Sequence, residues 1–594
     1  MTTPSSSAGA ELATAGLALH VQTDPRLRHA LTLLPEGDPL LKGVGARMFP
    51  IELNLRDRRL GGDDFRVVDF HAGPRVVIVT CIAGEVELRL TWSIGMMEAL
   101  CLLVQLRTAT PGSILDGTLG LSLLDHLHPG PLDRPPKHDA GIGPLTPSGR
   151  PVIRTGKYLL PWWWSSDTAG LAVIDRRAPN VSFPATYQPV TRNLPVRIRN
   201  EWMSASELIL MPCAPGWLGA FTAWRDQLRA GIDLTAYKRP DFAWYRNQWV
   251  QHFTFLYGKE IFDHRRGRLD VDQLLDDGQR FGGYDGILLW PAYPRIGVDE
   301  RDQFDFYDDL PGWRLGVREL ADRARERGTR VFIPYLPWDM IPDSRHGIPA
   351  AAPSKLARAV EDMAVDGVFL DTMDSIRSQF RAEIDARRSG VVFCSEGQPG
   401  RQIIGEITGS WDQAEHRHIG EVDLMRFLFP EHPSFLINRH ATGAHRERVI
   451  GRALFNGTGL VVWQDVFGEV LPFTDRQAAL TRDTARLLRA YAHCFRGVDA
   501  LPLVPTTDPA ILANGFTARG GSTAVTAYNA GEASIHGDLV AWQPMGSSRY
   551  QWRQVSLDEP SEGRQGGGES ISGNLAPGEL AVFVGVPRDR GTAG

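Results

Sequence analysis

The chain has 594 residues, a length that corresponds to about three or four domains of ordinary size. Hydrophobic residues make up 43% of it and charged residues 23%, which is typical of a soluble globular protein. The formal net charge of −6 gives no electrostatic basis for binding nucleic acid or an anionic membrane surface, so we exclude both as partners.

The cysteines and the N-terminus bear on the cellular compartment. The five cysteines are an odd number, widely spaced and without a CxxC pair, which favours a reducing compartment over a disulfide framework. The N-terminal stretch MTTPSSSAGAELATAGLALH lacks a basic region followed by a sustained apolar core, and no run approaches the ~20 apolar residues that span a bilayer. We therefore expect a cytoplasmic protein without a membrane segment.

Residues 1–238 are rich in strand patterns and predict an N-terminal antiparallel β-sandwich. Residues 75–94, RVVIVTCIAGEVELRLTWSI, alternate apolar and polar side chains around an AG turn, which predicts a hairpin. Residues 97–110 fit either a strand or a helix. The run 216–232 predicts a helix that leads out of the sandwich.

Residues 239–498 change to short apolar runs that alternate with helical ones, the signature of a parallel βαβ fold. The segment 312–328 is a clear helix, with Gly328 as its C-cap. Eight candidate strands lie at 244–253, 286–293, 330–338, 367–372, 390–396, 423–429, 434–440 and 459–465. Eight is the number that closes a (β/α)8 TIM barrel.

Residues 499–594 return to a β pattern. The runs TAVTAYNA, GDLVAWQ and ELAVFVGV lie between Gly-rich turns, which predicts a second, smaller antiparallel β-sandwich. The predicted fold class is therefore a multidomain α/β and all-β protein, in which a (β/α)8 barrel is flanked by N-terminal and C-terminal antiparallel β-sandwiches.

Two carboxylates end neighbouring strands of the predicted barrel. The stretch 366–398 reads DGVFLDTMDSIRSQFRAEIDARRSGVVFCSEGQ: one apolar run ends in Asp371 and, after a helical segment, a second ends in Glu396. The C-terminal ends of barrel strands share one rim, where active sites are built. The alternative role for Asp371 is to cap the following helix, which Asp374 serves equally well. Two carboxylates on this rim are the minimal equipment for cleaving a glycosidic bond.

The surroundings of the two carboxylates predict their roles. Phe393 and Cys394 provide apolar surroundings that raise the pKa of Glu396, and the neighbouring carboxylate adds to the rise, so Glu396 serves as general acid/base. Asp371 then stays ionised and attacks the anomeric carbon. A separation of about 5–5.5 Å between the carboxyl groups gives retention of configuration through a covalent glycosyl-enzyme intermediate.

The motifs VFLD at the end of strand four and FCSEG at the end of strand five resemble the α-retaining glycoside hydrolases. This group includes the α-amylase superfamily and the endo-α-N-acetylgalactosaminidase-like barrels, and the large N-terminal sandwich fits the latter better. The resemblance implies catalytic roles for Asp371 and Glu396 and an α-linked substrate. An ordinary amylase is disfavoured, because Phe369 and the run 438–440 (NRH) stand where amylases have an Arg and a His-Asp pair.

The α-galactosidase-like barrels are the competing template. They share the N-terminal sandwich, the style of the third strand (RVFIPYLPW) and a nucleophilic Asp on strand four. Their acid/base is an Asp on strand six, which points to Asp423 or Asp412 in this chain. Asp423 begins the predicted sixth strand instead of ending it, so this template has the wrong geometry and we prefer Glu396 as the acid/base.

Aromatic and polar residues at strand ends are candidate sugar contacts. Carboxylates and Arg hold vicinal hydroxyls by paired hydrogen bonds, and aromatic rings cover the apolar face of a sugar. The candidate substrate-binding residues are Trp290, Tyr293, Trp338, Asp339, Asp374, Arg426, Arg439, His440, Trp463 and Asp465.

No pattern in the sequence points to a metal or a cofactor. The HRH run at 416–418 resembles a metal-binding HxH pair, but it lies in a polar segment after strand five and has no convincing further ligands. The chain has no GxGxxG or GxxxxGK[ST] motif for a nucleotide. We therefore expect neither a metal nor a cofactor.

The sequence thus predicts a retaining glycoside hydrolase that acts on an α-linked oligosaccharide or glycoside by double displacement. Asp371 is the predicted nucleophile and Glu396 the predicted acid/base. Two alternatives stay open: a transglycosylase that uses the same carboxylates, and a non-catalytic carbohydrate-binding barrel protein. The second alternative predicts sugar binding without turnover and a carboxyl separation too large for catalysis.

Overall fold

The structure is a computed structural model. It describes residues 9–23, 28–33, 51–121, 161–165, 170–175, 194–291, 301–309, 312–340, 351–373, 376–413, 418–439, 442–497, 499–542, 544, 550–555, 557, 565–568 and 570–587. The chain divides into two compact units, one formed by 1–144 with 159–231 and the other by 145–158 with 232–594. The predicted boundaries between three domains are a different division of the chain and stay a prediction.

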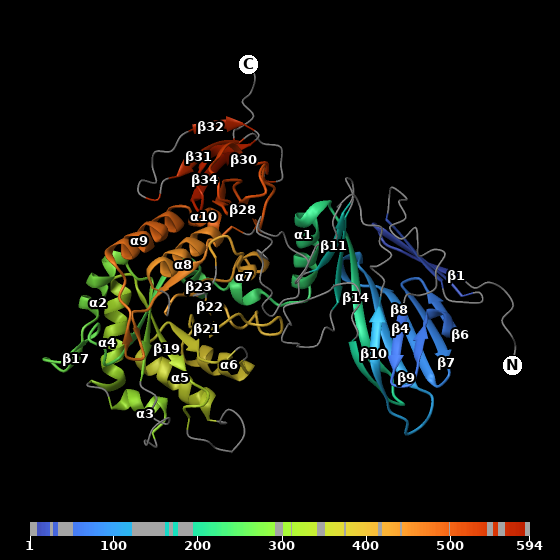
Figure 1. Ribbon diagram of the computed structural model, residues 1–594. Coiled ribbons are helices and arrows are strands. Elements are labelled where there is room, and N and C mark those ends of the chain that lie inside the picture. The colour runs from blue at the N-terminus through green and yellow to red at the C-terminus, as the bar shows by residue number, and fades with distance from the viewer. Residues whose placement is uncertain are drawn as a thin grey trace. The chain divides into compact units, whose positions relative to one another are not determined.

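The first unit consists of antiparallel strands in three sheets, with strand orders β11-β12-β14-β9-β8-β7-β6, β13-β10-β4-β5 and β1-β2-β3 (Figure 1). Its elements are β1 Gly9–Ala13, β2 Leu17–Gln22, β3 Arg28–Leu33, β4 Ile51–Leu55, β5 Arg59–Gly61, η1 Gly62–Asp64, β6 Arg66–Gly73, β7 Val76–Ala83, β8 Val86–Ile94, η2 Met96–Glu98, β9 Leu100–Thr108, β10 Leu115–Leu121, β11 Trp162–Ser165, β12 Gly170–Asp175, β13 Leu194–Ile198, β14 Met203–Cys213 and α1 Gly216–Arg229.

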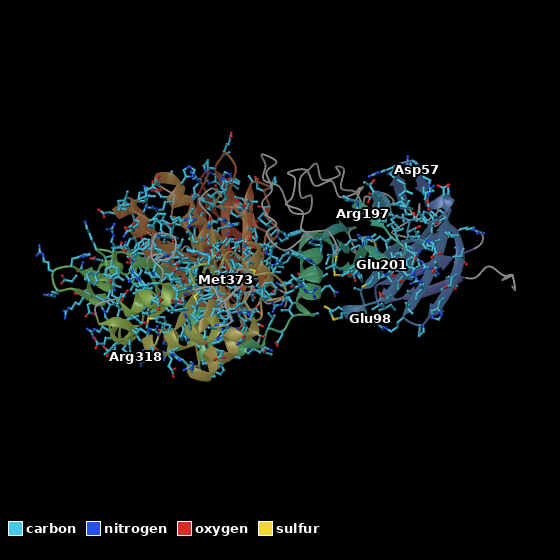
Figure 2. The ribbon with its side chains drawn as sticks, turned by 90° about the horizontal axis from the view of Figure 1, so that it is seen from below. Asp57, Glu98, Arg197, Glu201, Arg318 and Met373 are labelled. Atoms are coloured by element: carbon cyan, nitrogen blue, oxygen red, sulfur yellow. The ribbon has the colours of Figure 1, made fainter. Side chains whose placement is uncertain are left out.

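Apolar and polar residues alternate along these strands, so that one face of each strand is buried and the other is more exposed. The hairpin predicted over 75–94 is confirmed as β7 and β8, and the ambiguous segment 97–110 contains strand β9. Leu88 of β8, Val104 of β9 and Leu53 of β4 are buried in one core, so strands of two sheets share their apolar faces. Charged side chains of the unit pair at its surface, as Glu98 does with Arg75 (Figure 2).

Eight parallel strands close into a barrel in the second unit, in the order β15-β18-β19-β20-β21-β22-β23-β24. The barrel strands are β15 Val250–Phe255, β18 Gly286–Trp290, β19 Arg330–Tyr335, β20 Gly367–Leu370, β21 Val392–Glu396, β22 Gly409–Gln413, β23 Ser434–Ile437 and β24 Gly459–Val462. Their residues are buried almost throughout, as expected for parallel strands covered on both faces. The predicted barrel is confirmed.

Helices surround this barrel (Figure 1). They are η3 Thr235–Lys238, η4 Pro240–Asn247, α2 Val271–Asp277, η5 Gly278–Phe281, α3 Gln303–Asp308, α4 Trp313–Glu326, α5 Ala352–Met363, α6 Ser378–Arg387, α7 Leu424–Leu428, α8 Gly443–Asn456, α9 Asp475–Ala490 and α10 Ala492–Phe495. This unit also contains two short hairpins. One pairs β16 Phe262–Asp263 with β17 Arg268–Leu269, and the other pairs β25 Asp465–Val466 with β26 Glu469–Val470. None of the helices in the described ranges is long and apolar enough to cross a membrane.

The prediction of the sixth strand was wrong. Residues 423–429 (DLMRFLF) contain helix α7, and the sixth strand is β22, whose sequence is GSWDQ. The apolar run 423–429 favoured a strand, but a short apolar run fits a buried helix equally well. The buried strand β22 was missed because its polar residues, Ser410, Asp412 and Gln413, interrupt the apolar pattern.

The C-terminal part of this unit forms a six-stranded antiparallel sheet, β27-β28-β29-β34-β31-β32, and a two-stranded one, β30-β33. The strands are β27 Asp499–Leu501, β28 Ile511–Thr517, β29 Thr523–Asn529, β30 Ile535–Val540, β31 Tyr550–Val555, β32 Gln565–Gly568, β33 Ile571–Leu575 and β34 Leu580–Pro587. Asn514 and Thr526 both donate hydrogen bonds to the carbonyl of Phe455 in α8, at 3.0 and 2.7 Å, which fixes this sheet to the barrel.

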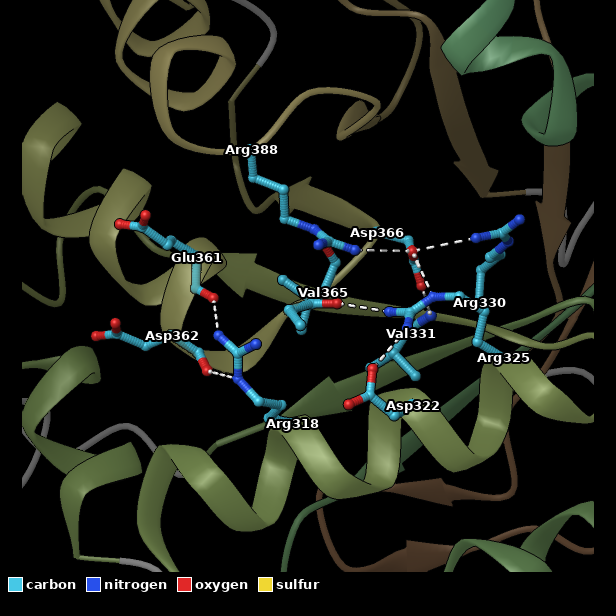
Figure 3. Close-up of polar contacts among 11 residues, drawn as sticks. Arg318, Asp322, Arg325, Arg330, Val331, Glu361, Asp362, Val365, Asp366 and Arg388 are labelled. Atoms are coloured by element: carbon cyan, nitrogen blue, oxygen red, sulfur yellow. Dashed lines mark hydrogen bonds and ion pairs between the residues drawn. The ribbon is translucent and has the colours of Figure 1, made fainter.

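A buried carboxylate fixes the N-terminal end of strand β20. Asp366 is 4% exposed and lies within 3.3 Å of Arg325, 3.3 Å of Arg330 and 3.5 Å of Arg388 (Figure 3). Its second oxygen accepts the backbone N–H of Val331 at 3.1 Å. Because Arg325 lies on α4 and Arg330 on β19, one carboxylate joins helix and strand at the end of the barrel opposite to the rim that carries Asp371.

Replacing Asp366 by Ala is expected to destabilise the barrel by about 3 kcal/mol, because three guanidinium groups lose their buried partner. Asp322→Ala is the matched control, since Asp322 binds the same Arg325 at 2.7 Å but its side chain is 56% exposed. The control is expected to cost less than about 1 kcal/mol. Calorimetric unfolding measures both, and equal losses would contradict the role given to Asp366.

Candidate active site

The register of two barrel strands brings Asp371 and Glu396 side by side. Leu370 of β20 is paired with Ser395 of β21, so the next residues, Asp371 and Glu396, lie opposite one another. Phe369, two residues before Asp371, has its side chain in the barrel core. Since side chains alternate along a strand, both carboxylates belong to the inner face, at the C-terminal mouth of the barrel.

The two carboxyl groups are in direct contact. A side-chain hydrogen bond joins Asp371 to Glu396. The backbone N–H of Thr372 donates to Oε2 of Glu396 at 3.0 Å, and Nε2 of Gln413 donates to Oε1 at 3.1 Å. Glu396 is therefore held on both oxygens by neighbours from strands β20 and β22.

Thr372 is held in an unusual backbone conformation. Its φ is 54°, in the left-handed region that residues other than glycine rarely adopt. Its hydroxyl donates to the carbonyl of Asp371 at 2.8 Å, while its N–H faces the carboxyl pair. Such strain persists only where surrounding contacts enforce it, and it is concentrated at functional sites.

The surroundings of Asp371 favour its protonated form. Burial raises the pKa of Asp371 to about 7, and the negative charge of Glu396 and the hydrogen bond between them add to the rise. The positive charge of Arg439 and the backbone N–H of Thr372 lower the pKa of Asp371 and so limit that rise. Carboxyl groups coupled in this way titrate as a unit.

The expected environment of Glu396 is corrected in one respect. Phe393 does not face the site, because its ring lies 4.0 Å from the guanidinium of Arg381 on α6, outside the barrel. Cys394 does lie in the barrel core beneath the site, where burial raises the pKa of its thiol to about 12. Among the two carboxyl groups of the site, a raised pKa is found for Asp371.

Aromatic rings surround the carboxylates on the inner face. Trp290 is 3% exposed and its ring centroid lies 6.0 Å from that of Phe369. The guanidinium of Arg439 lies 5.2 Å from the centroid of the Trp463 ring and also interacts with the charge of Asp371. Of the predicted sugar contacts, the structure therefore links Trp290, Arg439 and Trp463 to the carboxyl pair.

The other predicted contacts have different surroundings. Trp338 follows β19 and is 41% exposed, whereas Asp339 beside it is fully buried. Asp465 accepts the N–H of Gly468 at 2.8 Å and so caps a turn. Tyr293, Asp374 and His440 lie outside the described residues.

Arg426 lies against the C-terminal sheet. It is fully buried on α7, its guanidinium donates to the carbonyls of Gly457 and Pro430 at 3.3 Å, and it lies 5.4 Å from the centroid of the Phe516 ring. These contacts join the barrel to the C-terminal sheet and account for the burial of this residue without a sugar.

The α-galactosidase-like template pointed to Asp412 or Asp423 as the acid/base, and neither residue lies in the position of Glu396. Asp412 is paired with Leu436, whose side chain packs on α8 outside the barrel, so alternation places Asp412 on the outer face of β22. Asp423 precedes α7, where Oδ1 accepts a long hydrogen bond of 3.4 Å from Gln398. Gln413 is the residue of β22 that reaches the carboxyl pair.

Sequence analysis missed Gln413 and Thr372. Because the sixth strand had been placed at 423–429, Gln413 was not recognised as the last residue of a barrel strand and was not predicted as a site residue. Thr372 acts through its backbone, which no side-chain pattern records. In the described part of the chain, no group of three or more His, Cys, Asp and Glu side chains is arranged to hold a metal ion.

The eight-stranded parallel barrel between antiparallel sheets defines the fold class as a (β/α)8 barrel with flanking β domains. No family model and no curated protein matches the sequence. Among solved structures, the chain is similar to the galactosidase domain of the α-galactosidase–sucrose kinase AgaSK, with a TM-score of 0.51 and 11% identity, over 98% of this chain and 99% of that chain.

Two further similarities are weaker. The GH36 α-galactosidase AgaA from Geobacillus stearothermophilus gives a TM-score of 0.49 at 9% identity, over 98% of this chain and all of that one. A glycoside hydrolase family 97 enzyme from Pseudoalteromonas sp. strain K8 gives 0.47 at 8%, with coverages of 98% and 100%. At these identities the likeness is one of fold.

Asp371→Asn is expected to stabilise the protein more at pH 8 than at pH 4.5. The folded-state pKa of about 7 lies above the ordinary value of 3.8 for an Asp side chain, so the folded protein binds this proton more tightly and loses stability as pH rises between those values. The expected gain at pH 8 is about 2 kcal/mol, less than the full shift because the site opens to water.

Thermal unfolding of both proteins at the two pH values tests this expectation. The double variant with Glu396→Gln is the internal control, since removing either carboxyl of a coupled pair ends the repulsion and the second change adds little. Equal gains at pH 4.5 and pH 8 would mean that no proton is shared.

Proposed function

We propose that this protein is a retaining glycoside hydrolase that cleaves an α-linked glycoside. The observation that carries the proposal is that Asp371 and Glu396 follow paired residues of two neighbouring strands at the mouth of the barrel and interact there. An inverting enzyme keeps its carboxyl groups about 6.5–9.5 Å apart to admit water between them, and a pair in contact leaves no such space. The contact also argues against a decayed, non-catalytic barrel.

In the first step, the carboxylate of Asp371 forms a bond to the anomeric carbon as the bond to the leaving oxygen breaks. Glu396 gives its proton to that oxygen. The hydrogen bond between the two groups lets the shared proton pass to Glu396, and the charge of Arg439 favours the ionised form of Asp371. Glu396 then removes a proton from water, whose oxygen displaces Asp371 from the sugar.

The fold of the chain supports this assignment. Active sites of (β/α)8 barrels lie at the C-terminal ends of the strands, where the carboxyl pair, Trp290 and Trp463 are found. The solved structures whose fold this chain resembles include the galactosidase domain of AgaSK. Names of this kind are those of glycosidases. These names agree with the proposed reaction class.

Asp371→Asn is expected to lower kcat/KM by about 10⁴-fold or more, and Glu396→Gln by about 10³-fold. Asp412→Asn is the control, because its carboxylate lies on the outer face of β22, and it is expected to keep most of the activity. A panel of α- and β-nitrophenyl glycosides, with the product anomer followed by NMR, measures rate and stereochemistry together. Loss of activity in Asp412→Asn with retention in Glu396→Gln would assign the acid to strand six.

The activity is expected to fall as pH rises through about 7. The proposed active form of the pair carries one proton, which is lost as pH rises above the raised pKa of Asp371, so no acid is then left for the leaving oxygen. A profile of kcat/KM against pH should show its alkaline limb near 7. A rate that stays constant from pH 6 to pH 9 would contradict the shared proton.

A further inference from the structure

A cavity of about 430 Å³ opens at the C-terminal mouth of the barrel, where strands β15 and β18 end and the β25–β26 hairpin turns. This volume lies within the range of small-molecule sites, about 300–1,000 Å³. The cavity is lined by Phe255, Leu256, Tyr257, Gly258, Trp290, Asp465, Phe467 and Gly468. Four of these eight residues are aromatic.

Among the described residues that line the cavity, the side-chain donors are the Tyr257 hydroxyl and the Trp290 indole N–H, and three backbone N–H groups already have partners. The backbone N–H of Leu256 donates to the carbonyl of Trp290 at 3.0 Å, that of Gly258 to Phe255 at 2.8 Å, and that of Gly468 to the Asp465 carboxylate at 2.8 Å. Asp465 is the one charged side chain among the described residues that line the cavity. A second sugar ring would bring several hydroxyl groups to a surface that has little to pair with them.

One wall of the cavity is the tip of the β25–β26 hairpin. Phe467 is 51% exposed and has a φ of 53°, so a large aromatic side chain occupies a backbone conformation that favours glycine. Asp465 caps the turn by accepting the Gly468 N–H. A half-exposed aromatic ring on a strained turn lowers the stability of the folded protein. We therefore attribute a binding role to Phe467.

The opposite wall is fixed. Tyr257 is 41% exposed, and its ring centroid lies 5.7 Å from that of Phe306. Glu260, three residues further on, bonds to His252 at 3.0 Å and accepts Gln464 at 3.1 Å. These bonds tie the loop after β15 to both β15 and the segment after β24, so the cavity exists before any ligand arrives.

The cavity and the carboxyl pair lie at the same mouth of the barrel. The ring centroid of Phe467 lies 6.0 Å from that of Trp463, which is itself 5.2 Å from the guanidinium of Arg439. Trp290 lines the cavity and also belongs to the hydrophobic cluster inside the barrel. Ring contacts therefore connect the cavity lining to Trp463 and Trp290, which also lie near the side chains around the carboxyl pair.

We propose that this cavity is the aglycone site, and that it takes a flat, mostly apolar group such as an aryl ring. The inference rests on the proposed glycosidase function and names its substrate class: glycosides of aromatic alcohols in preference to disaccharides. The rings of Phe467 and Tyr257 enclose the aglycone from two sides, and Asp465 accepts at most one polar group on it.

The test measures the binding of an aryl ligand and the turnover of glycosides separately. Isothermal titration of the full-length Asp371→Asn variant with 4-nitrophenol should give saturable binding, which Phe467→Gly weakens by about tenfold because a ring contact is lost. Glycine suits the positive φ, so this change is not expected to disturb the turn. Tyr257→Ala removes the other wall and should weaken binding comparably. Val470→Ala, in the same hairpin and outside the lining, is the control and should leave binding unchanged.

Each outcome decides one of the two proposals. Binding of 4-nitrophenol that depends on Phe467, in a protein that hydrolyses no glycoside, upholds the aryl cavity and removes the proposed function. Hydrolysis in which Phe467→Gly affects aryl glycosides and methyl glycosides equally overturns the aglycone assignment and leaves the glycosidase. Tighter binding of a reducing disaccharide than of 4-nitrophenol also overturns it.

Discussion

The hydrogen bond between Asp371 and Glu396 is the constraint on which the proposed chemistry depends. Two carboxyl groups can lie in contact inside a protein only if they share a proton, because two adjacent negative charges in a poorly solvated site repel strongly. The surrounding structure maintains that contact. Thr372 and Gln413 hold the two oxygens of Glu396, and the charge of Arg439 reaches Asp371 from strand β23's end.

The barrel stabilises the two ends of strand β20 in different ways. At the N-terminal end, Asp366 is compensated by three Arg side chains and a backbone N–H. At the C-terminal end, Asp371 is raised in pKa by burial and by a like charge, an arrangement that costs stability as pH rises. Asp366 and Asp371 thus flank one strand of four residues, and the first acid supports the fold while the second is suited to chemistry.

The carboxyl pair and seven of the eight barrel strands could be predicted from the sequence, because parallel strands are apolar and their ends share a rim. The sixth strand could not, since Ser410 and Asp412 give β22 a polar pattern while α7 reads as a strand. Because of that error, the contact of Gln413 with Glu396 was not predicted. The position of the raised pKa depends on contacts across strands, such as that of Arg439 with Asp371, which sequence spacing does not encode.

The central claim is that Asp371 forms a covalent bond to the sugar while Glu396 manages the proton. The most direct test is mass spectrometry of the Glu396→Gln variant after incubation with an activated fluoroglycosyl substrate of the sugar that the protein turns over. Without its acid/base, this variant releases the intermediate slowly. The account predicts one added sugar per chain, on the peptide that contains Asp371. A label on any other carboxylate, or a product with inverted configuration, would contradict it.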